Sequence, residues 1–338
     1  MSPAPPVATP LAVTLGDPAG IGPEIVAAAW AALKASGPSF FAVGDARTLA
    51  AAGAPVRAIA DPAEAVGWFG EALPVLDLPL EEIPPAGRPS AAAAAFVVRW
   101  IEAAVQLALD GAAAGIVTAP IAKATLYEAG FAFPGHTEFI GELTRSSPLA
   151  GARGPVMMLA AADLRTALVT VHEPLARVPD LVTEDRIVGV GTVVAEALAR
   201  DFGIASPRLA VAGLNPHAGE GGALGREDLD VVAPAVAALK ARGIDARGPL
   251  SADTMFHAAA RTGYDAALCL YHDQALIPVK MLDFWGGVNL TLGLPIVRTS
   301  PDHGTAFDIA GQHRARPDSL IAAIRLAAEI AGRRRAAG

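Results

Sequence analysis

Short apolar runs of strand length alternate with longer segments of helical pattern along most of the chain. In the first half, residues 11–15, 40–43 and 114–118 predict strands, whereas residues 25–34 and 91–109 predict helices. Strands that alternate with helices are typical of a largely parallel sheet with helices packed on it. The pattern therefore predicts an α/β protein.

The same alternation continues through the second half. Residues 165–171, 209–214 and 266–271 predict three further strands, and a helix is expected over residues 184–200 with Thr183 as its N-cap. Two polar residues in this half are expected to have structural roles. Asp228 is predicted to cap a helix over residues 229–242, and His257 is predicted to lie within a helix.

A loop-like stretch near residue 130 interrupts the alternation. Residues 130–137 read Gly-Phe-Ala-Phe-Pro-Gly-His-Thr, which is typical of a connection between domains. We expect one α/β domain formed by residues 1–130 together with 300–338, and a second α/β domain formed by residues 131–299.

Composition narrows the class of protein. Of the 338 residues, 53% are hydrophobic, which is ample for a core, and the net charge of −8 argues against a nucleic-acid partner. The single cysteine, Cys269, excludes a disulfide framework and favours the cytoplasm. The N-terminus lacks the pattern of a signal peptide. Arg99 and Glu102 interrupt the longest apolar run, so no membrane-spanning segment is expected.

Three of the seven histidines directly follow apolar strands: His172, His217 and His272. In open α/β sheets the carboxyl ends of the strands line the ligand crevice. Three imidazoles at that edge would form a metal site with open positions for a substrate. A histidine after a strand is also a common hydrogen-bonded loop residue, and this structural interpretation stays open.

Further polar residues lie near strand ends or in loops: His136, Thr137, Lys280, Asn289 and Arg298. Lysine and arginine together favour an anionic ligand group such as phosphate or carboxylate, although each could instead form a surface salt bridge. The Gly-rich turn at residues 16–24 lacks the spacing of the dinucleotide fingerprint.

These residues leave three functions open. A metal-assisted dehydrogenase and a metal-dependent hydrolase both fit, and so does a phosphate-binding module with a structural metal. The zinc-protease motif HExxH and the serine-centred nucleophile elbow are both absent from the sequence.

The chain resembles the 4-hydroxythreonine-4-phosphate dehydrogenase family from Thr14 to Gly311. Five blocks carry the resemblance: GHTEF at 135–139, LNPHAGE at 214–220, SADT at 251–254, YHDQ at 271–274 and DHGTA at 302–306. The first and last blocks also resemble the wider isocitrate and isopropylmalate dehydrogenases. The resemblance implies a two-domain α/β/α fold without a Rossmann fingerprint, with cofactor-side loops in the first domain and the metal ligands and dimer interface in the second.

The resemblance also implies a reaction. It is the NAD- or NADP-dependent oxidation of 4-phosphooxy-L-threonine at C3, followed by decarboxylation to 3-amino-2-oxopropyl phosphate, a step in pyridoxal 5′-phosphate biosynthesis. A divalent metal such as zinc, magnesium or cobalt would take part, and the active site would be shared between the subunits of a homodimer. Related enzymes act on threonate or erythronate 4-phosphate, or on aromatic diols. The sugar-acid enzymes tend to have Gly-His after His-Asp-Gln, where this chain has Ala275-Leu276.

Matched position by position, the resemblance assigns roles to individual residues. The metal ligands would be His172, His217 and His272. The substrate-binding residues would be His136, Thr137, Lys280, Asn289 and Arg298. Lys280 or Asp253 would assist proton transfer, and His303 and Gly304 would lie near the cofactor. The stretch Gln312 to Arg316 departs from relatives, and a histidine or arginine there could meet the 2′-phosphate of NADP.

Overall fold

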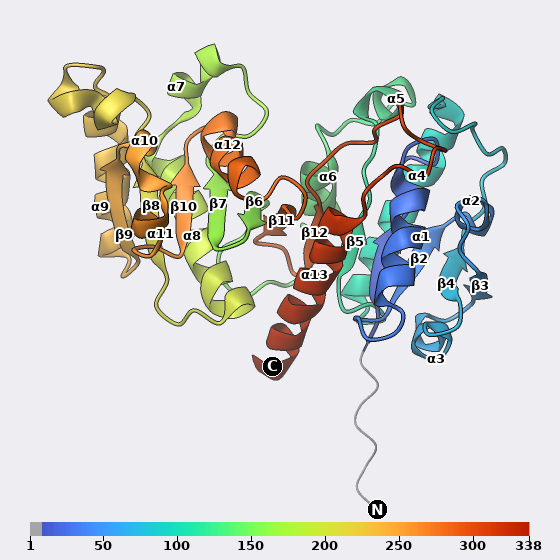
Figure 1. The fold of residues 1–338 in the computed structure, drawn as a ribbon. Coiled ribbons are helices and arrows are strands. Elements are labelled where there is room, and N and C mark those ends of the chain that lie inside the picture. The colour runs from blue at the N-terminus through green and yellow to red at the C-terminus, as the bar shows by residue number, and fades with distance from the viewer. Residues whose placement is uncertain (1–8, 338) are drawn as a thin grey trace, which may run out of the picture. The chain divides into compact units, whose positions relative to one another are not determined.

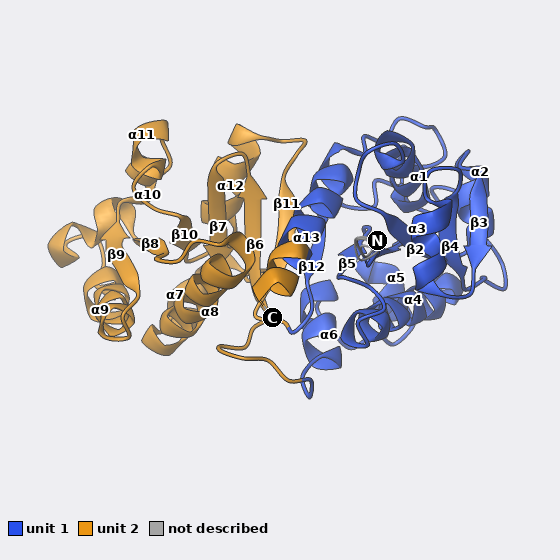
Figure 2. Ribbon diagram, turned by 90° about the horizontal axis from the view of Figure 1, so that it is seen from below, with its two compact units in different colours: residues 1–147, 295–331 blue, residues 148–294, 332–338 orange. Residues whose placement is uncertain are grey.

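The computed structural model describes residues 9–337, which form two compact units (Figure 2). Unit 1 contains the chain up to residue 147 together with residues 295–331, and unit 2 contains residues 148–294 and those from 332 onward. The predicted domains divide instead at residues 130 and 300, so residues 131–147, with His136 and Thr137, lie in unit 1 rather than with the metal-ligand segment. The α/β class predicted from the sequence is confirmed.

Unit 1 is built on a parallel sheet (Figure 1). Its strands lie in the order β3-β4-β2-β1-β5-β12. Their bounds are β1 (Leu11–Thr14), β2 (Phe40–Gly44), β3 (Val56–Ile59), β4 (Leu73–Asp77), β5 (Ile116–Thr118) and β12 (Arg298–Pro301). The helices are α1 (Gly22–Leu33), α2 (Ala46–Ala51), α3 (Ala65–Trp68), α4 (Ala91–Leu109), α5 (Lys123–Glu128), α6 (His136–Leu143) and α13 (Asp318–Ala337), with a 3₁₀ turn at Pro62–Glu64.

Helices cover both faces of this sheet. In Figure 2, α1 and α4 lie on opposite sides of the strands. Every residue of β1 and β2 is buried, as expected for parallel strands that pack against helices on both faces. Burial on both faces explains why these strands appear in the sequence as continuous apolar runs.

The long helix α4 forms as the sequence predicts. The Ser90 hydroxyl accepts a hydrogen bond from Ala92 N at 3.3 Å and caps the helix. By length and composition alone α4 is apolar enough to cross a membrane, although Arg99 and Glu102 lie within it. The helix nevertheless packs against β1 and β2, and Trp100 is buried, which is typical of a core helix.

Unit 2 contains a mixed sheet in the order β11-β6-β7-β10-β8-β9. Its strands are β6 (Val156–Ala161), β7 (Leu164–Leu168), β8 (Arg208–Ala212), β9 (Asp245–Leu250), β10 (Ala266–Cys269) and β11 (Val288–Leu292). The α-helices are α7 (Val178–Leu181), α8 (Glu184–Phe202), α9 (Ala233–Ala241), α10 (Ala252–Met255), α11 (Ala258–Arg261) and α12 (His272–Leu282). Shorter helical turns span Leu175–Arg177, Pro216–Gly222 and Asp228–Val232.

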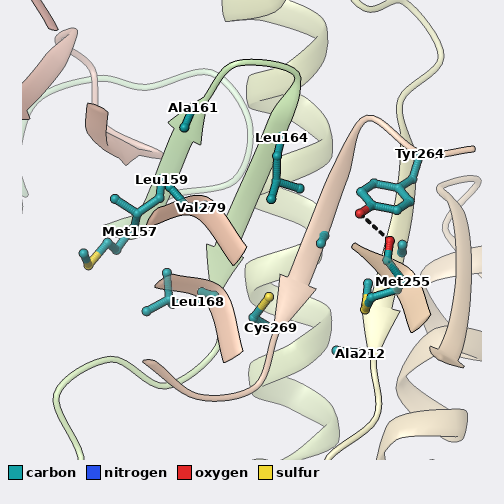
Figure 3. Close-up of a cluster of buried hydrophobic side chains, with 13 residues drawn as sticks. Met157, Leu159, Ala161, Leu164, Leu168, Ala212, Met255, Tyr264, Cys269 and Val279 are labelled. Atoms are coloured by element: carbon teal, nitrogen blue, oxygen red, sulfur yellow. Dashed lines mark hydrogen bonds between the residues drawn. The ribbon is translucent and has the colours of Figure 1, made fainter. Parts of the chain in front are cut away.

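The strands β7, β10, β8 and β9 are parallel neighbours, whereas β6 runs antiparallel to both β7 and β11. Helices α8 and α9 lie on one face of the sheet, and α10 to α12 lie on the other (Figure 2). Figure 3 shows the apolar core between the sheet and α12, in which Leu159, Leu168 and Val279 pack together and the Tyr264 hydroxyl donates a hydrogen bond to Met255 O at 2.9 Å.

The capping prediction for Thr183 is correct, as it is for Ser90, whereas the predictions for Asp228 and His257 are wrong. Thr183 accepts a hydrogen bond from Arg186 N and caps α8, as expected. Asp228 does not act as an N-cap, because its carboxylate binds backbone N–H groups of an earlier loop. His257 precedes α11 as its N-cap rather than lying within a helix, and its Nδ1 accepts from Ala260 N. His257 therefore has a structural role, as expected, but as a helix cap.

Candidate active site

Three neighbouring parallel strands deliver the three predicted metal-binding histidines in unit 2. Strand β10 lies between β7 and β8, so the carboxyl ends of all three strands meet at one edge of the sheet. His172 follows β7, His217 follows β8, and His272 follows β10. The rings of His172 and His272 lie close together, with centroids 5.7 Å apart and planes inclined by 41°. Two of the three predicted metal-binding imidazoles therefore lie next to each other.

His272 is oriented by the acid that follows it. It is the first residue of α12, and its Nδ1 shares a hydrogen bond of 2.8 Å with Asp273 Oδ1. This contact leaves Nε2 as the nitrogen that can bind a metal. A carboxylate on the far nitrogen is the usual support of a metal-ligating histidine, because it fixes the ring and increases its basicity.

His217 lies in a turn of unusual backbone conformation. Five successive residues from His217 to Gly221 have positive φ, beginning with 52° at His217. Left-handed backbone is costly for residues other than glycine, and such strain is characteristic of functional loops that the surrounding structure holds in place. Here the buried carboxylate of Asp228 holds the start of the loop, accepting from Leu214 N at 2.7 Å and from Asn215 N at 3.0 Å.

Gln274 links the strand ends that carry His217 and His272. Its side chain is only 7% exposed. Its Oε1 accepts from Leu270 N at 2.7 Å, and its Nε2 donates to Gly213 O at 2.8 Å. Because Gly213 directly follows β8 and Leu270 directly follows β10, this one amide fixes the spacing of the two loops.

The residues fit a metal in their chemistry. Imidazole nitrogens are good ligands for zinc, cobalt and similar ions, and His272 has the supporting carboxylate that such a ligand needs. Residues 9–337 of this one chain nevertheless contain no group of three His, Cys, Asp or Glu side chains that could hold a metal ion.

A cationic cluster lies in unit 1. Arg298 begins β12 and is 4% exposed, and its Nη2 donates to Thr118 Oγ1 at the end of the neighbouring strand β5, at 2.8 Å. Burial lowers the pKa of Arg298 to about 10, and the nearby carboxylate of Glu138 opposes this effect. The guanidinium therefore stays charged at neutral pH inside the protein. A charge buried in this way is a strong ligand for an anion.

His136, the first residue of α6, borders this cluster. Its pKa lies well below the ordinary value, because burial disfavours the imidazolium and because Arg298 and Lys123 repel it. Although the ring is half-buried, its Nε2 atom is fully buried and has no hydrogen-bond partner among the described residues. A neutral imidazole with one unused nitrogen is suited to hydrogen-bond a ligand. Thr137 follows it in the same helical turn.

Two more predicted substrate-binding residues lie in unit 2. The buried Oδ1 of Asn289, on β11, has no hydrogen-bond partner in the part of the chain that the structure describes. Lys280 is in the last turn of α12, and its Nζ lies 5.2 Å from the centre of the Phe284 ring.

Asp253, one of the two candidates for proton transfer, is an exposed residue of α10. Its carboxylate accepts a hydrogen bond from Ser251 Oγ at 2.6 Å. This bond lowers the pKa of Asp253, and His217 contributes in the same direction. Asp253 is therefore a weaker base than an ordinary carboxylate, and it lies within electrostatic reach of one predicted metal ligand.

The predicted cofactor residues His303 and Gly304 lie in an exposed loop of unit 1 that packs on the Gly-rich turn after β1. Ile21 N donates to Thr305 O at 3.0 Å and joins the two. A Cβ at Gly304 would meet no atom within 4 Å, so the packing of the protein does not require a glycine at this position.

Several cavities lie in unit 1, and none of those described below is lined by His303 or Gly304. Two cavities of about 210 and 190 Å³ share Glu24, Ala52 and His313 in their walls. A larger cavity of about 580 Å³ is lined mainly by α4, including Phe96 and Trp100, and contains none of the predicted site residues. Cavity size alone therefore does not locate the site.

Two residues at the site were not singled out for it from the sequence. Lys123 approaches His136, and Gln274 bridges two strand ends. Both residues belong to stretches that follow predicted strands, and this position is the one feature of the sequence that could have indicated a role at the site. Their partners depend on which strands become neighbours, and the sequence pattern does not contain that order.

Unit 2 carries the strand-end histidines and unit 1 carries the buried cationic cluster, and both are residue types that α/β enzymes of small-molecule metabolism use. Comparison with known proteins identifies the family. Residues 37–327 match the family model described as pyridoxal phosphate biosynthetic protein PdxA. The chain belongs to this family, in agreement with the resemblance in its sequence blocks.

Proteins similar to this chain carry a dehydrogenase name. A Caulobacter vibrioides protein named 4-hydroxythreonine-4-phosphate dehydrogenase is 65% identical over 96% of this chain and 98% of its own length. A Maricaulis maris protein with the same name is 55% identical, over 96% of this chain and 98% of its own length. The crystal structure of 4-hydroxythreonine-4-phosphate dehydrogenase from Klebsiella pneumoniae superposes with a TM-score of 0.85 at 41% identity, covering 97% of this chain and 99% of that one. These relatives support a dehydrogenase role.

Proposed function

We propose that this protein oxidises 4-phosphooxy-L-threonine at C3 with NAD or NADP and then decarboxylates the product to 3-amino-2-oxopropyl phosphate, in the biosynthesis of pyridoxal 5′-phosphate. One observation carries the proposal: in a chain of this family, three adjacent parallel strands each place a histidine at the same sheet edge, and two of the rings meet. The net charge of −8 argues against a nucleic-acid ligand and fits a small-molecule substrate. The single, buried cysteine fits a cytoplasmic enzyme.

His172, His217 and His272 would hold a divalent metal such as zinc, magnesium or cobalt. When bound, such an ion orients the substrate and acts as a Lewis acid toward its oxygen atoms. Asp273 would keep the His272 ring in its ligating orientation through the 2.8 Å hydrogen bond.

The other residues would bind the substrate and move its protons. Arg298, His136 and Thr137 would bind the phosphate, and Asn289 Oδ1 would accept a hydrogen bond from the substrate. NAD or NADP, when bound, would accept the hydride from C3, and Lys280 Nζ or the Asp253 carboxylate would take the proton of the C3 hydroxyl. One of the same two groups would return a proton to C2 once carbon dioxide has left. His303 and Gly304 would lie beside the cofactor.

The partner would be a second copy of the chain. Large apolar side chains are exposed on α12 and the turn after it, and the four most exposed are Ile277, Met281, Phe284 and Trp285, at 61%, 82%, 61% and 50%. We call these four residues the α12 patch. Exposed apolar patches mark association surfaces, and this one continues from the helix that begins with His272. A homodimer would cover the patch and share metal ligands between subunits.

The test is an assay of the purified protein with metal, NAD or NADP and 4-phosphooxy-L-threonine. Formation of reduced nicotinamide together with carbon dioxide is the expected result. Threonate and erythronate 4-phosphates are run in parallel, and faster cofactor reduction with either of them would replace the proposed substrate. Phosphate release without cofactor reduction would indicate a hydrolase, and binding without any turnover would indicate a binding module.

A further inference from the structure

Lys123 is an exposed residue whose side chain lies beside the first turn of α6. It begins α5, five residues after the end of β5. Its Cε and Nζ lie 3.4 and 3.6 Å from the position that a Cβ on Gly135 would occupy. Gly135 immediately precedes His136. The ammonium group of Lys123 therefore lies over the start of α6 rather than extending away from it.

This arrangement gathers positive charge. The amino end of a helix carries a partial positive charge, which disfavours a lysine nearby. Lys123 and the buried Arg298 also both repel a proton on His136. Within residues 9–337, no side chain forms a hydrogen bond or an ion pair with the Lys123 ammonium. The carboxylate of Glu138 lies nearby, with Oε2 3.5 Å from the same Cβ position, and it acts on Arg298.

The groups gathered here fit an anion that accepts several hydrogen bonds. Arg298 and Lys123 each offer charged N–H donors, and the buried Nε2 of His136 has no partner among the described residues. A phosphate monoester has three oxygen atoms that can accept hydrogen bonds from such donors at the same time.

We propose that Lys123 binds the phosphate monoester of the substrate together with Arg298 and the first turn of α6, and that it sets the preference for a phosphorylated substrate. The proposal deepens the proposed function, because it assigns the phosphate end of that substrate to unit 1. The four elements that form this phosphate site are the end of β5 and the starts of β12, α5 and α6. All four belong to one compact unit, so the site is complete within it.

The experiment compares Lys123→Met, which keeps the length of the side chain but removes its charge, with Lys123→Arg, which keeps the charge. Lys34→Met is the matched control, because Lys34 is an exposed lysine of the same unit whose Nζ lies over the Trp30 ring. Two quantities are measured for each protein. One is the Kd of inorganic phosphate by calorimetry, and the other is kcat and KM for 4-phosphooxy-L-threonine and for unphosphorylated 4-hydroxythreonine.

Loss of a charged hydrogen bond weakens binding about 10-fold or more. We expect this loss for Lys123→Met in the Kd of phosphate and in the KM of the phosphorylated substrate only, with rescue by Lys123→Arg and no change in Lys34→Met. Equal loss with both substrates, or a Kd that matches that of Lys34→Met, would overturn the proposal. If the wild type binds phosphate through Lys123 but turns over no substrate, the proposed function fails and this inference stands. If Lys123→Met turns over the substrate with a normal KM, the proposed function stands and this inference fails.

Discussion

At the scale of single residues, the buried guanidinium of Arg298 has two separable roles. One is structural, because it donates a 2.8 Å hydrogen bond to the fully buried Thr118 hydroxyl. The other is the proposed contact with the substrate phosphate. Arg298→Ala should lower kcat/KM by roughly 10- to 150-fold and should also lower the melting temperature, since a buried hydroxyl loses its partner.

Thr118→Val separates these two roles. It removes the structural hydrogen bond and retains the guanidinium, so we expect a lower melting temperature with a small change in kcat/KM. If Thr118→Val reduces kcat/KM as much as Arg298→Ala does, Arg298 acts through the structure and not through the substrate. Steady-state kinetics and thermal melts of the same preparations provide both readouts.

His136 makes stability depend on pH in a predictable direction. Its pKa is lower in the folded protein than the ordinary value of 6.5, so the unfolded chain binds the proton more readily. The neutral ring therefore contributes stability above about pH 6.5, and this contribution is lost as the pH falls toward the folded pKa. In His136→Gln, the decline of the melting temperature below about pH 6.5 should be shallower than in the wild type. His313→Gln, at an exposed loop residue, is the control. Parallel pH profiles for wild type and His136→Gln would contradict the assignment.

At the scale of elements, the side chain of Gln274 links the carboxyl ends of β8 and β10, which carry two of the predicted metal ligands. Gln274→Ala would leave Gly213 O and Leu270 N without their partners. An unsatisfied buried polar group costs about 1–3 kcal/mol. Because the same amide spaces the His217 and His272 loops, metal affinity should fall about 10- to 100-fold, as is typical when support of a metal ligand is lost.

The measurements are metal stoichiometry after dialysis against a graded chelator, and unfolding in denaturant. Gln106→Ala is a matched control, since the amide of Gln106 makes an exposed hydrogen bond to Asp110 on α4 of the other unit. Reduced stability with unchanged metal affinity would show that Gln274 supports the sheet alone.

At the scale of the whole molecule, the proposed active site requires a second copy. Met281, the most exposed residue of the α12 patch, contributes apolar area that a homodimer would bury. Met281→Asp should shift the protein from dimer to monomer in analytical ultracentrifugation and should remove bound metal and activity together. Ile83→Asp, at an exposed apolar residue of unit 1, should leave both unchanged. A monomeric wild type that binds metal and is active would refute the shared site.

The sequence by itself determined the local elements and the family. Apolar periodicity located β1, β2 and β10, and the caps Ser90 and Thr183 marked the starts of α4 and α8 correctly. These features depend on neighbours within a few residues, so they can be predicted from a single sequence. The blocks around His217 and His272 indicated the family for the same reason, because each is contiguous in the chain.

Only the tertiary structure decided how these pieces meet. Gln274 bonds to Gly213 across 61 residues because β10 lies beside β8, and strand order is not encoded in local periodicity. Asp228 resembles an N-cap in sequence, but a loop preceding it in the chain supplies the N–H groups that its buried carboxylate binds. Lys123 resembles a surface lysine in sequence, and only the fold brings it to the start of α6. Electrostatic and hydrogen-bonding partners are set by proximity in space, and the packing of the sheet and its helices creates that proximity.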